Sequence, residues 1–127
     1  MNAATVLDAN PPLSRCVQDW HPEERLWLEQ YVAAVRERYP DAVSRLLLYG
    51  SKARGDAHEE SDIDLMLIVK DEAESLMWDL RWIGYDLAAT SWAVPSILAR
   101  SEAEWARLER LCSPFHAAVE RDGIRVL

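Results

Sequence analysis

Two aspartates lie two positions apart at the start of an apolar stretch. Asp62 and Asp64 open the sequence DIDLMLIV, residues 62–69. Because residues i and i+2 of a strand point to the same face, we expect the two carboxylates to lie side by side. Carboxylates this close raise each other's pKa, and a bound cation removes that cost. Oxygen ligands of this kind suit Mg²⁺ or Mn²⁺, especially an ion that also carries phosphate oxygens.

A Gly-Ser pair precedes these aspartates, with ten residues between Ser51 and Asp62. Gly50 allows backbone N–H groups to approach an anion without a β-carbon in the way. A helical turn over residues 51–54 would also point its free N–H groups at phosphates. The Ser51 hydroxyl can donate to a phosphate oxygen. Lys52 and Arg54 are candidates for neutralising phosphate charge, although either one could instead be a solvated loop residue.

The remaining polar residues near this loop have simpler interpretations. We expect Asp56 to brace the loop rather than bind metal, and His58, His21 and His116 to be surface or packing residues rather than bases. Residues 56–64 carry five acids and no Lys or Arg. This segment is therefore strongly negative and should attract metal ions.

The rest of the chain predicts the elements that hold these residues. Apolar runs predict strands at 44–49, 62–69 and 92–99, and a last short strand at 124–127. Helical spacing and start signals predict helices from Pro22 to before Pro40, over 71–89, over 101–111 and from Ser113-Pro114 to Gly123. Residues 52–61 should form a loop with one helical turn. The strand at 62–69 should be covered on both faces, and Pro95 should make the third strand an edge or bulged strand.

This order of elements predicts an α/β (α+β) fold, in which helices flank a small mixed β-sheet. The length of 127 residues suits one domain. We expect a single domain over residues 21–127. Residues 1–20 contain the breaker Asn10-Pro11-Pro12 and are expected to form an irregular N-terminal arm.

Composition narrows the classes of partner. The formal net charge is −8, whereas nucleic-acid-binding proteins carry a surplus of Lys and Arg, so we expect no nucleic-acid partner. No apolar run reaches the length of a membrane span. Cys16 and Cys112 lack metal-site spacing and are expected to be free thiols in a reducing compartment, which favours the cytoplasm.

The segment GSKARGDAHEESDIDLMLIV (50–69) resembles the minimal nucleotidyltransferase (MNT) branch of the DNA polymerase β-type nucleotidyltransferase superfamily. The resemblance implies a polymerase β-like nucleotidyltransferase fold and transfer of a nucleoside monophosphate, with ATP as the expected donor, to an acceptor hydroxyl. Asp62 and Asp64 would hold Mg²⁺ or Mn²⁺, and Gly50, Ser51, Lys52 and Arg54 would bind the nucleotide. MNT proteins often pair with a HEPN-type ribonuclease toxin, so the resemblance also implies a protein partner of that kind and an antitoxin role. A homo-oligomer is the other possibility.

One feature departs from the family pattern. The family usually carries a third carboxylate on the following strand, and the corresponding place falls near Pro95 or Ser96, where this chain has no acid. Asp86, Glu102 and Glu104 are the nearest substitutes in sequence. A catalytically weak or inactive binding module, which neutralises a partner by occlusion, is therefore an alternative. A small-molecule nucleotidyltransferase of the aminoglycoside-modifying type is less expected, because those enzymes carry an extra helical domain.

Six tryptophans are many for this length. Those in predicted helices are explained by packing between helix and sheet. An exposed subset could instead form a surface for a partner, because tryptophan is favoured at binding hot spots.

Overall fold

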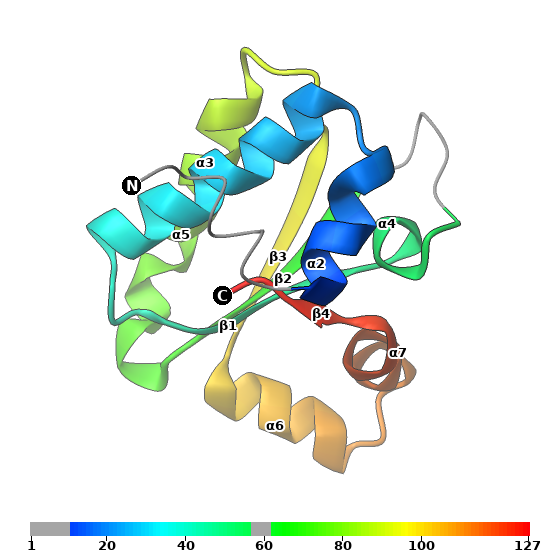
Figure 1. Cartoon of the computed structure of the whole chain (residues 1–127). Coiled ribbons are helices and arrows are strands. Elements are labelled where there is room, and N and C mark those ends of the chain that lie inside the picture. The colour runs from blue at the N-terminus through cyan, green and yellow to red at the C-terminus, as the bar shows by residue number, and fades with distance from the viewer. Residues whose placement is uncertain (1–10, 57–61) are drawn as a thin grey trace.

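The computed structural model describes residues 11–56 and 62–127. Four strands form one sheet in the order β3-β2-β1-β4 (Figure 1). Strand β2 runs parallel to β3 and antiparallel to β1, and β1 is antiparallel to β4. The mixed sheet is therefore confirmed, and Pro95 opens an edge strand as expected. The strands are β1 (Val43–Tyr49), β2 (Ile63–Val69), β3 (Pro95–Ser101) and β4 (Ile124–Arg125).

Helices connect and cover these strands in an alternating α/β order. No helix in the described part of the chain is long and apolar enough to cross a membrane. The helices are α2 (Pro11–Cys16), η1 (Val17–Asp19), α3 (Pro22–Arg38), α4 (Ser51–Arg54), η2 (Asp71–Leu76), α5 (Met77–Ala88), α6 (Glu102–Arg110) and α7 (Pro114–Asp122).

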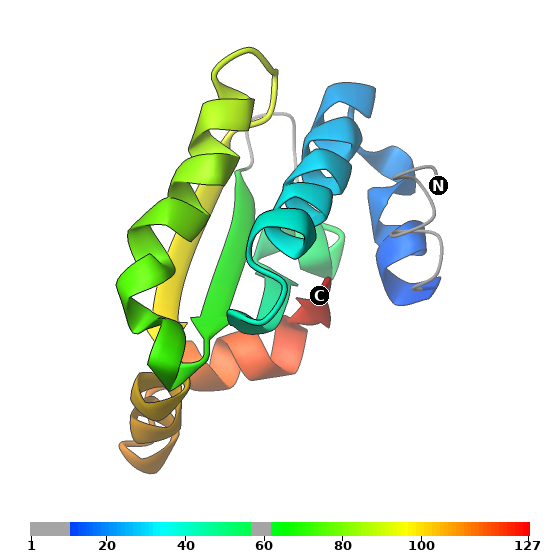
Figure 2. The ribbon, with the colours of Figure 1, turned by 90° about the vertical axis from the view of Figure 1, so that its left-hand side faces the viewer.

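The two faces of the sheet pack against different helices. Helices α3 and α5 lie on one side of the strands, and α6 and α7 lie on the other (Figure 1, Figure 2). Side chains alternate between the faces along each strand, so Leu46, Leu48 and Leu65 belong to the larger core, whereas Leu47 and Met66 belong to the smaller one. Strand β2 is almost entirely buried, which confirms that it is covered on both faces.

Local signals in the sequence explain where the helices begin. His21 caps α3, where its Nδ1 accepts a hydrogen bond from the backbone N–H of Glu23 and Pro22 occupies the first turn. Ser101 forms the expected capping box with Glu104 at the start of α6. Strand β3 begins later than the predicted residue 92, because the Ser91 hydroxyl accepts a hydrogen bond from the N–H of Ala93 and keeps this segment in a turn.

The prediction of an irregular N-terminal arm is wrong for residues 11–19, while residues 1–10 lie outside the described residues. Pro11–Cys16 is helical and Val17–Asp19 forms a 3₁₀ turn. Leu13 and Val17 are fully buried in the larger core. Pro11 and Pro12 therefore start a helix, since proline is favoured in a first helical turn. Burial of two apolar side chains then attaches this segment to the sheet.

Candidate active site

The end of β1 and the start of β2 bring Gly50 against Asp64. Tyr49 pairs with Asp64 across the two antiparallel strands, so Gly50 follows directly beside the carboxylate. A β-carbon on Gly50 would lie 2.3 Å from Asp64 Oδ2. Gly50 also has φ +75°, a conformation that favours glycine. Only a glycine fits this turn with Asp64 in place.

The Gly-Ser turn continues into α4, the single helical turn that the sequence predicts. The N–H groups of Ala53 and Arg54 both donate to the carbonyl oxygen of Gly50, each at 3.1 Å. The N–H groups of Ser51 and Lys52 precede these first bonds and lie at the open end of the turn. Groups in such a position are available to an anion. The turn ends at Gly55, which has φ +84°.

Arg54 is held beside the Gly-Ser turn by two acids from different parts of the chain. Its Nε lies 3.3 Å from Asp56 Oδ2, and its Nη1 lies 3.7 Å from Asp122 Oδ2 at the end of α7. The pairing with Asp56 agrees with the expected bracing role. Asp122 was not identified from the sequence, because no local signal links residue 122 to residue 54.

Lys52 points away from the open end of the turn, into the protein. Its side chain is 5% exposed and its Nζ lies 2.8 Å from Glu24 Oε2. The ammonium group also lies 5.2 Å from the centre of the Trp20 ring, within cation–π distance. The Cys16 thiol donates to the Lys52 carbonyl oxygen at 2.7 Å. The structure thus places Lys52 in a buried ion pair, and we do not assign it to phosphate binding.

The electrostatic environment of Asp64 is unfavourable for its negative charge. Partial burial raises the pKa of Asp64 above the ordinary carboxyl value, and the neighbouring Asp62 raises it further, while Arg54 lowers it. Asp62 is exposed just before β2 begins. Asp62 therefore acts on Asp64 as their spacing predicts. A cation between the two carboxylates would offset their repulsion.

Aromatic residues form the wall of the site on the α7 side. Tyr49 meets Phe115 edge to face, with ring centres 5.8 Å apart, and Phe115 in turn contacts Trp105 of α6. The pKa of Tyr49 is raised, first by burial and then by Asp64, and Arg100 lowers it. Tyr49 and Arg100 were not selected from the sequence, since only strand register shows that they share the face of Asp64.

No acid stands near Pro95 or Ser96, where the resemblance predicts a third carboxylate. In the parallel pairing of β2 and β3, Asp64 is opposite Ser96, close to the position predicted from the sequence. Of the possible substitutes, Glu104 caps α6 and Glu102 accepts a hydrogen bond from Ser44. Asp86 is exposed on α5. Among residues 11–56 and 62–127, no group of three or more His, Cys, Asp or Glu could hold a metal ion.

Asp62 and Asp64 nevertheless fit a hard cation that takes its other ligands from the substrate and from water. Two carboxylates supply oxygen donors, and burial and the neighbouring Asp62 raise the pKa of Asp64. Mg²⁺ is usually bound through one or two carboxylates together with substrate phosphates and water. The Gly50–Ser51 turn lies directly beside Asp64.

The structure thus brings together most, but not all, of the site residues predicted from the sequence. Gly50, Ser51, Arg54, Asp62 and Asp64 meet at one end of the sheet. Lys52 belongs to the same turn but faces the core. His58 lies outside the described residues. His21 caps a helix and His116 is buried against Trp105, which confirms their interpretation as structural residues.

The known proteins that match this chain are described as nucleotidyltransferases or candidate protein adenylyltransferases. Residues 28–111 match the model of a family described as the nucleotidyltransferase domain. Two candidate protein adenylyltransferases of Methanocaldococcus jannaschii are also similar, one 39% identical over 41 residues (32% of this chain) and the other 52% identical over 31 residues (24% of this chain). These matches span only 41% and 31% of the lengths of the two relatives.

A solved structure supports the fold. The crystal structure of a candidate nucleotidyltransferase from Sulfolobus solfataricus superposes with a TM-score of 0.50 at 20% sequence identity, and the match covers 81% of each chain. At this identity the likeness concerns the fold alone.

Proposed function

Because this chain belongs to the nucleotidyltransferase domain family, we propose that it transfers AMP from ATP to a hydroxyl group of a protein, with Mg²⁺ or Mn²⁺ as the metal. The observation that carries this proposal is the packing of Gly50 against Asp64. It joins the Gly-Ser turn to a pair of carboxylates at one end of the sheet. Such a pair is suited to a cation that also holds a triphosphate.

Each residue of the site has a role in this proposal. Asp62 and Asp64 hold the metal ion, which when bound neutralises triphosphate charge and polarises the reacting phosphate. The N–H groups at the start of α4 and the Ser51 hydroxyl bind phosphate oxygens. Arg54, which is kept in place by Asp56 and Asp122, adds positive charge beside them. Positioning and charge neutralisation would supply most of the rate.

The reaction conserves atoms and charge without a further reactant. The acceptor oxygen forms a bond to the α-phosphorus of ATP. The bond between that phosphorus and the oxygen bridging to the β-phosphate breaks, and its electron pair leaves with pyrophosphate. The proton of the acceptor hydroxyl is released to water. The product is an AMP ester of the acceptor.

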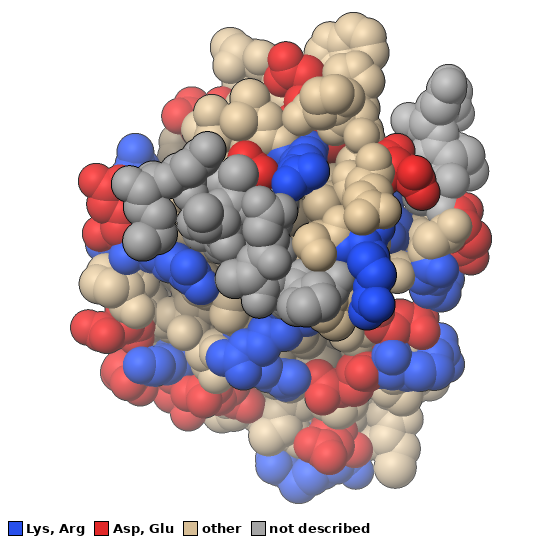
Figure 3. Space-filling model, viewed as in Figure 1, with Lys and Arg blue, Asp and Glu red and all other residues tan. Residues whose placement is uncertain are grey.

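A protein acceptor is supported by the relatives, whose names describe candidate protein adenylyltransferases. This chain resembles the MNT branch, and on that ground we propose that the acceptor is a tyrosine of a partner HEPN-type toxin. The chain would then act as the antitoxin. We propose no nucleic-acid partner. The net charge is −8, and acidic and basic side chains are interspersed on the face shown in Figure 3.

Labelled ATP tests this function directly. The protein is incubated with ATP labelled at the α-phosphate, Mg²⁺ and the protein encoded beside it, and label on the partner is measured. Asp62→Asn and Asp64→Asn should each abolish transfer, whereas Asp79→Asn, at an exposed aspartate of α5, should not. Absence of transfer by the folded wild-type protein, with magnesium-dependent ATP binding intact, would refute transfer to that partner.

A binding module is the second candidate function, and two observations favour it. The strand partner of Asp64 on β3 is Ser96, which is not an acid. The stacked rings of Trp78 and Trp82 are 68% and 55% exposed on α5, so the packing explanation fails for these two tryptophans. Exposed aromatic pairs are typical of protein interfaces. Neutralisation of a partner that survives the change of both Asp62 and Asp64 to Asn would favour occlusion over transfer.

A further inference from the structure

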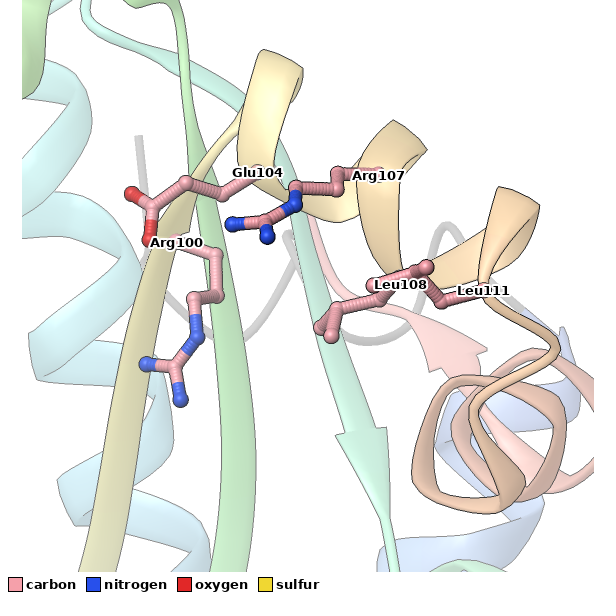
Figure 4. Close-up of a pocket in the computed structure, with 5 residues that line it drawn as sticks. All are labelled: Arg100, Glu104, Arg107, Leu108 and Leu111. Carbon is pink, nitrogen blue, oxygen red and sulfur yellow. The ribbon is translucent and has the colours of Figure 1, made fainter.

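A groove lies between the end of β3 and helix α6, on the face of the sheet that carries Asp64. Its volume is about 200 Å³. Figure 4 shows one arginine of β3 and one arginine of α6 among the residues that line it, with two leucines farther along the helix. The lining residues are Arg100, Glu104, Arg107, Leu108 and Leu111.

The two arginines of this groove have no carboxylate partner among the described residues. Arg100 donates from Nη1 to the carbonyl oxygen of Ala99 at 2.8 Å, and no ion pair within 4.0 Å joins either Arg100 or Arg107 to an acid in residues 11–56 and 62–127. Glu104 lines the same groove, but its Oε1 accepts hydrogen bonds from the N–H and hydroxyl of Ser101. The local acid is thus engaged in the cap of α6.

This arrangement is unusual in a chain with 22 acidic and 14 basic residues. Like charges that share a groove repel each other, and an anion between them turns this repulsion into attraction. Arginine is suited to such a site, because its planar fork binds the two oxygens of a carboxylate or phosphate together. With two arginines and one glutamate in its lining, the groove offers a net positive charge to an anion.

Strand register connects the groove to the candidate active site. Ser96 and Arg100 are four residues apart on β3, so their side chains share a face, and Ser96 is the partner of Asp64. The Arg100 side chain extends away from α6 along the strands (Figure 4). Its charge lowers the pKa of Tyr49, the strand partner of Asp64. Arg100 of the groove thus lies on the same sheet face as Asp64.

The lining favours a carboxylate on a peptide over a phosphate of the nucleotide. Leu108 and Leu111 provide an apolar side, and Leu111 is 64% exposed, which suits aliphatic parts of a peptide. The α-carbons of Ser96 and Arg100 are about 13 Å apart along an extended strand. The triphosphate would bind at the opposite end of β3, beside Gly50 and Ser51.

We propose that the groove between β3 and α6 binds an acidic side chain of the protein acceptor, through Arg100 and Arg107, and so selects hydroxyl groups that have a Glu or Asp nearby. This inference rests on the proposed transfer to a protein. It adds a substrate class to that transfer: acceptor segments that combine acidic and aliphatic residues.

Peptide binding tests the groove without requiring turnover. The probe is a fluorescein-labelled synthetic peptide with a tyrosine flanked by Glu and Leu, and the reference peptide has Gln in place of each Glu. Fluorescence anisotropy should show at least about tenfold tighter binding of the Glu peptide. The double variant R100A/R107A should lose this preference, and R100K/R107K should retain only part of it, because lysine keeps the charge but not the fork.

The matched control is R36A/R38A, which removes the same charge from exposed positions at the end of α3, on the other side of the sheet. It should bind both peptides as the wild type does. Thermal unfolding should confirm that all variants are folded. Equal binding of both peptides to the wild type, or an unchanged preference in R100A/R107A, would overturn the proposal.

A second titration separates this inference from the proposed function. Binding of ATP with Mg²⁺ should be unchanged in R100A/R107A and lost in Asp64→Asn, while Asp64→Asn should keep its preference for the Glu peptide. Loss of ATP binding in R100A/R107A, with peptide binding intact, would assign the groove to the nucleotide instead and refute an acceptor role. Failure of the wild type to bind ATP would count against the proposed function. The peptide titration would still decide whether the groove binds acidic side chains.

Discussion

Gly50 and Asp64 are in such close contact that the space of a single β-carbon on Gly50 is already taken by the Asp64 carboxylate, with Oδ2 2.3 Å from the ideal position. Gly50, which leaves the backbone open to an anion, and Asp64, which is proposed to hold the metal, therefore pack as one unit. A change in either should affect both structure and ligand binding.

Gly50→Ala should destabilise the protein and weaken ATP–Mg²⁺ binding. The cost has two parts: a positive φ, worth about 1–3 kcal/mol, and displacement of Asp64. Gly55→Ala is the matched control, because Gly55 has φ +84° and no atom within 4 Å of its missing β-carbon. Urea unfolding should show a larger loss for Gly50→Ala, and calorimetry should show reduced nucleotide binding for that variant alone. Equal losses in both variants would mean that the contact with Asp64 contributes nothing.

Asp64→Asn should raise the melting temperature of the metal-free protein near neutral pH. The folded protein raises the pKa of Asp64, chiefly by burial and next by Asp62, so the folded state binds this proton more tightly than the unfolded chain does. The charged side chain therefore costs stability above the raised pKa, and the cost vanishes as pH falls below the ordinary carboxyl value. Melting temperatures of both proteins should be measured from neutral pH to below the ordinary carboxyl pKa, and they should converge at low pH. A wild type more stable than the variant at neutral pH would contradict this expectation.

Breaking the buried pair of Lys52 and Glu24 should destabilise the fold without a specific loss of nucleotide binding. Glu24→Gln leaves the Lys52 ammonium, 5% exposed, without its carboxylate, and breaking a buried pair costs about 3–5 kcal/mol. Replacing both residues by apolar ones, Lys52→Met with Glu24→Leu, should recover much of this stability. Arg121→Ala removes an exposed arginine that pairs with Asp122 and should change the unfolding midpoint little.

The same variants decide what Lys52 does. ATP–Mg²⁺ binding should persist in the double variant Lys52→Met/Glu24→Leu, because we assign the lysine to the core and not to phosphate. A selective loss of ATP affinity in this stable variant would restore the phosphate role that the sequence suggested.

The two cysteines should react with thiol reagents at very different rates. Both are free, Cys112 is exposed, and Cys16 is partly buried. Burial raises the pKa of Cys16 and outweighs the opposing effect of Lys52, so less of the reactive thiolate forms at a given pH. Alkylation with iodoacetamide near neutral pH, followed by mass spectrometry, should modify Cys112 first. Cys112→Ser should leave a slow reaction that accelerates only at higher pH, and a fast remaining reaction would contradict the burial of Cys16.

Much of the fold follows from local patterns in the sequence. Pro22 after His21 and the capping box of Ser101 predict where α3 and α6 begin, because these signals satisfy helix-end N–H groups with neighbouring residues. The apolar run after Asp62 predicts a strand buried on both faces. By contrast, the helix at Pro11–Cys16 was missed, because what secures it is the burial of Leu13 and Val17 against residues far along the chain.

The sequence by itself determined the short-range part of the site: a Gly-Ser turn after a strand, and two aspartates at strand spacing. Only the tertiary structure decided the partners of these residues. It placed Lys52 against Glu24, Arg54 against Asp122, and Ser96 opposite Asp64. The physical reason is that spacing along a chain fixes the geometry of neighbours in one element. Contacts between elements depend on register, burial and charge pairing, which exist only once the sheet and helices have packed.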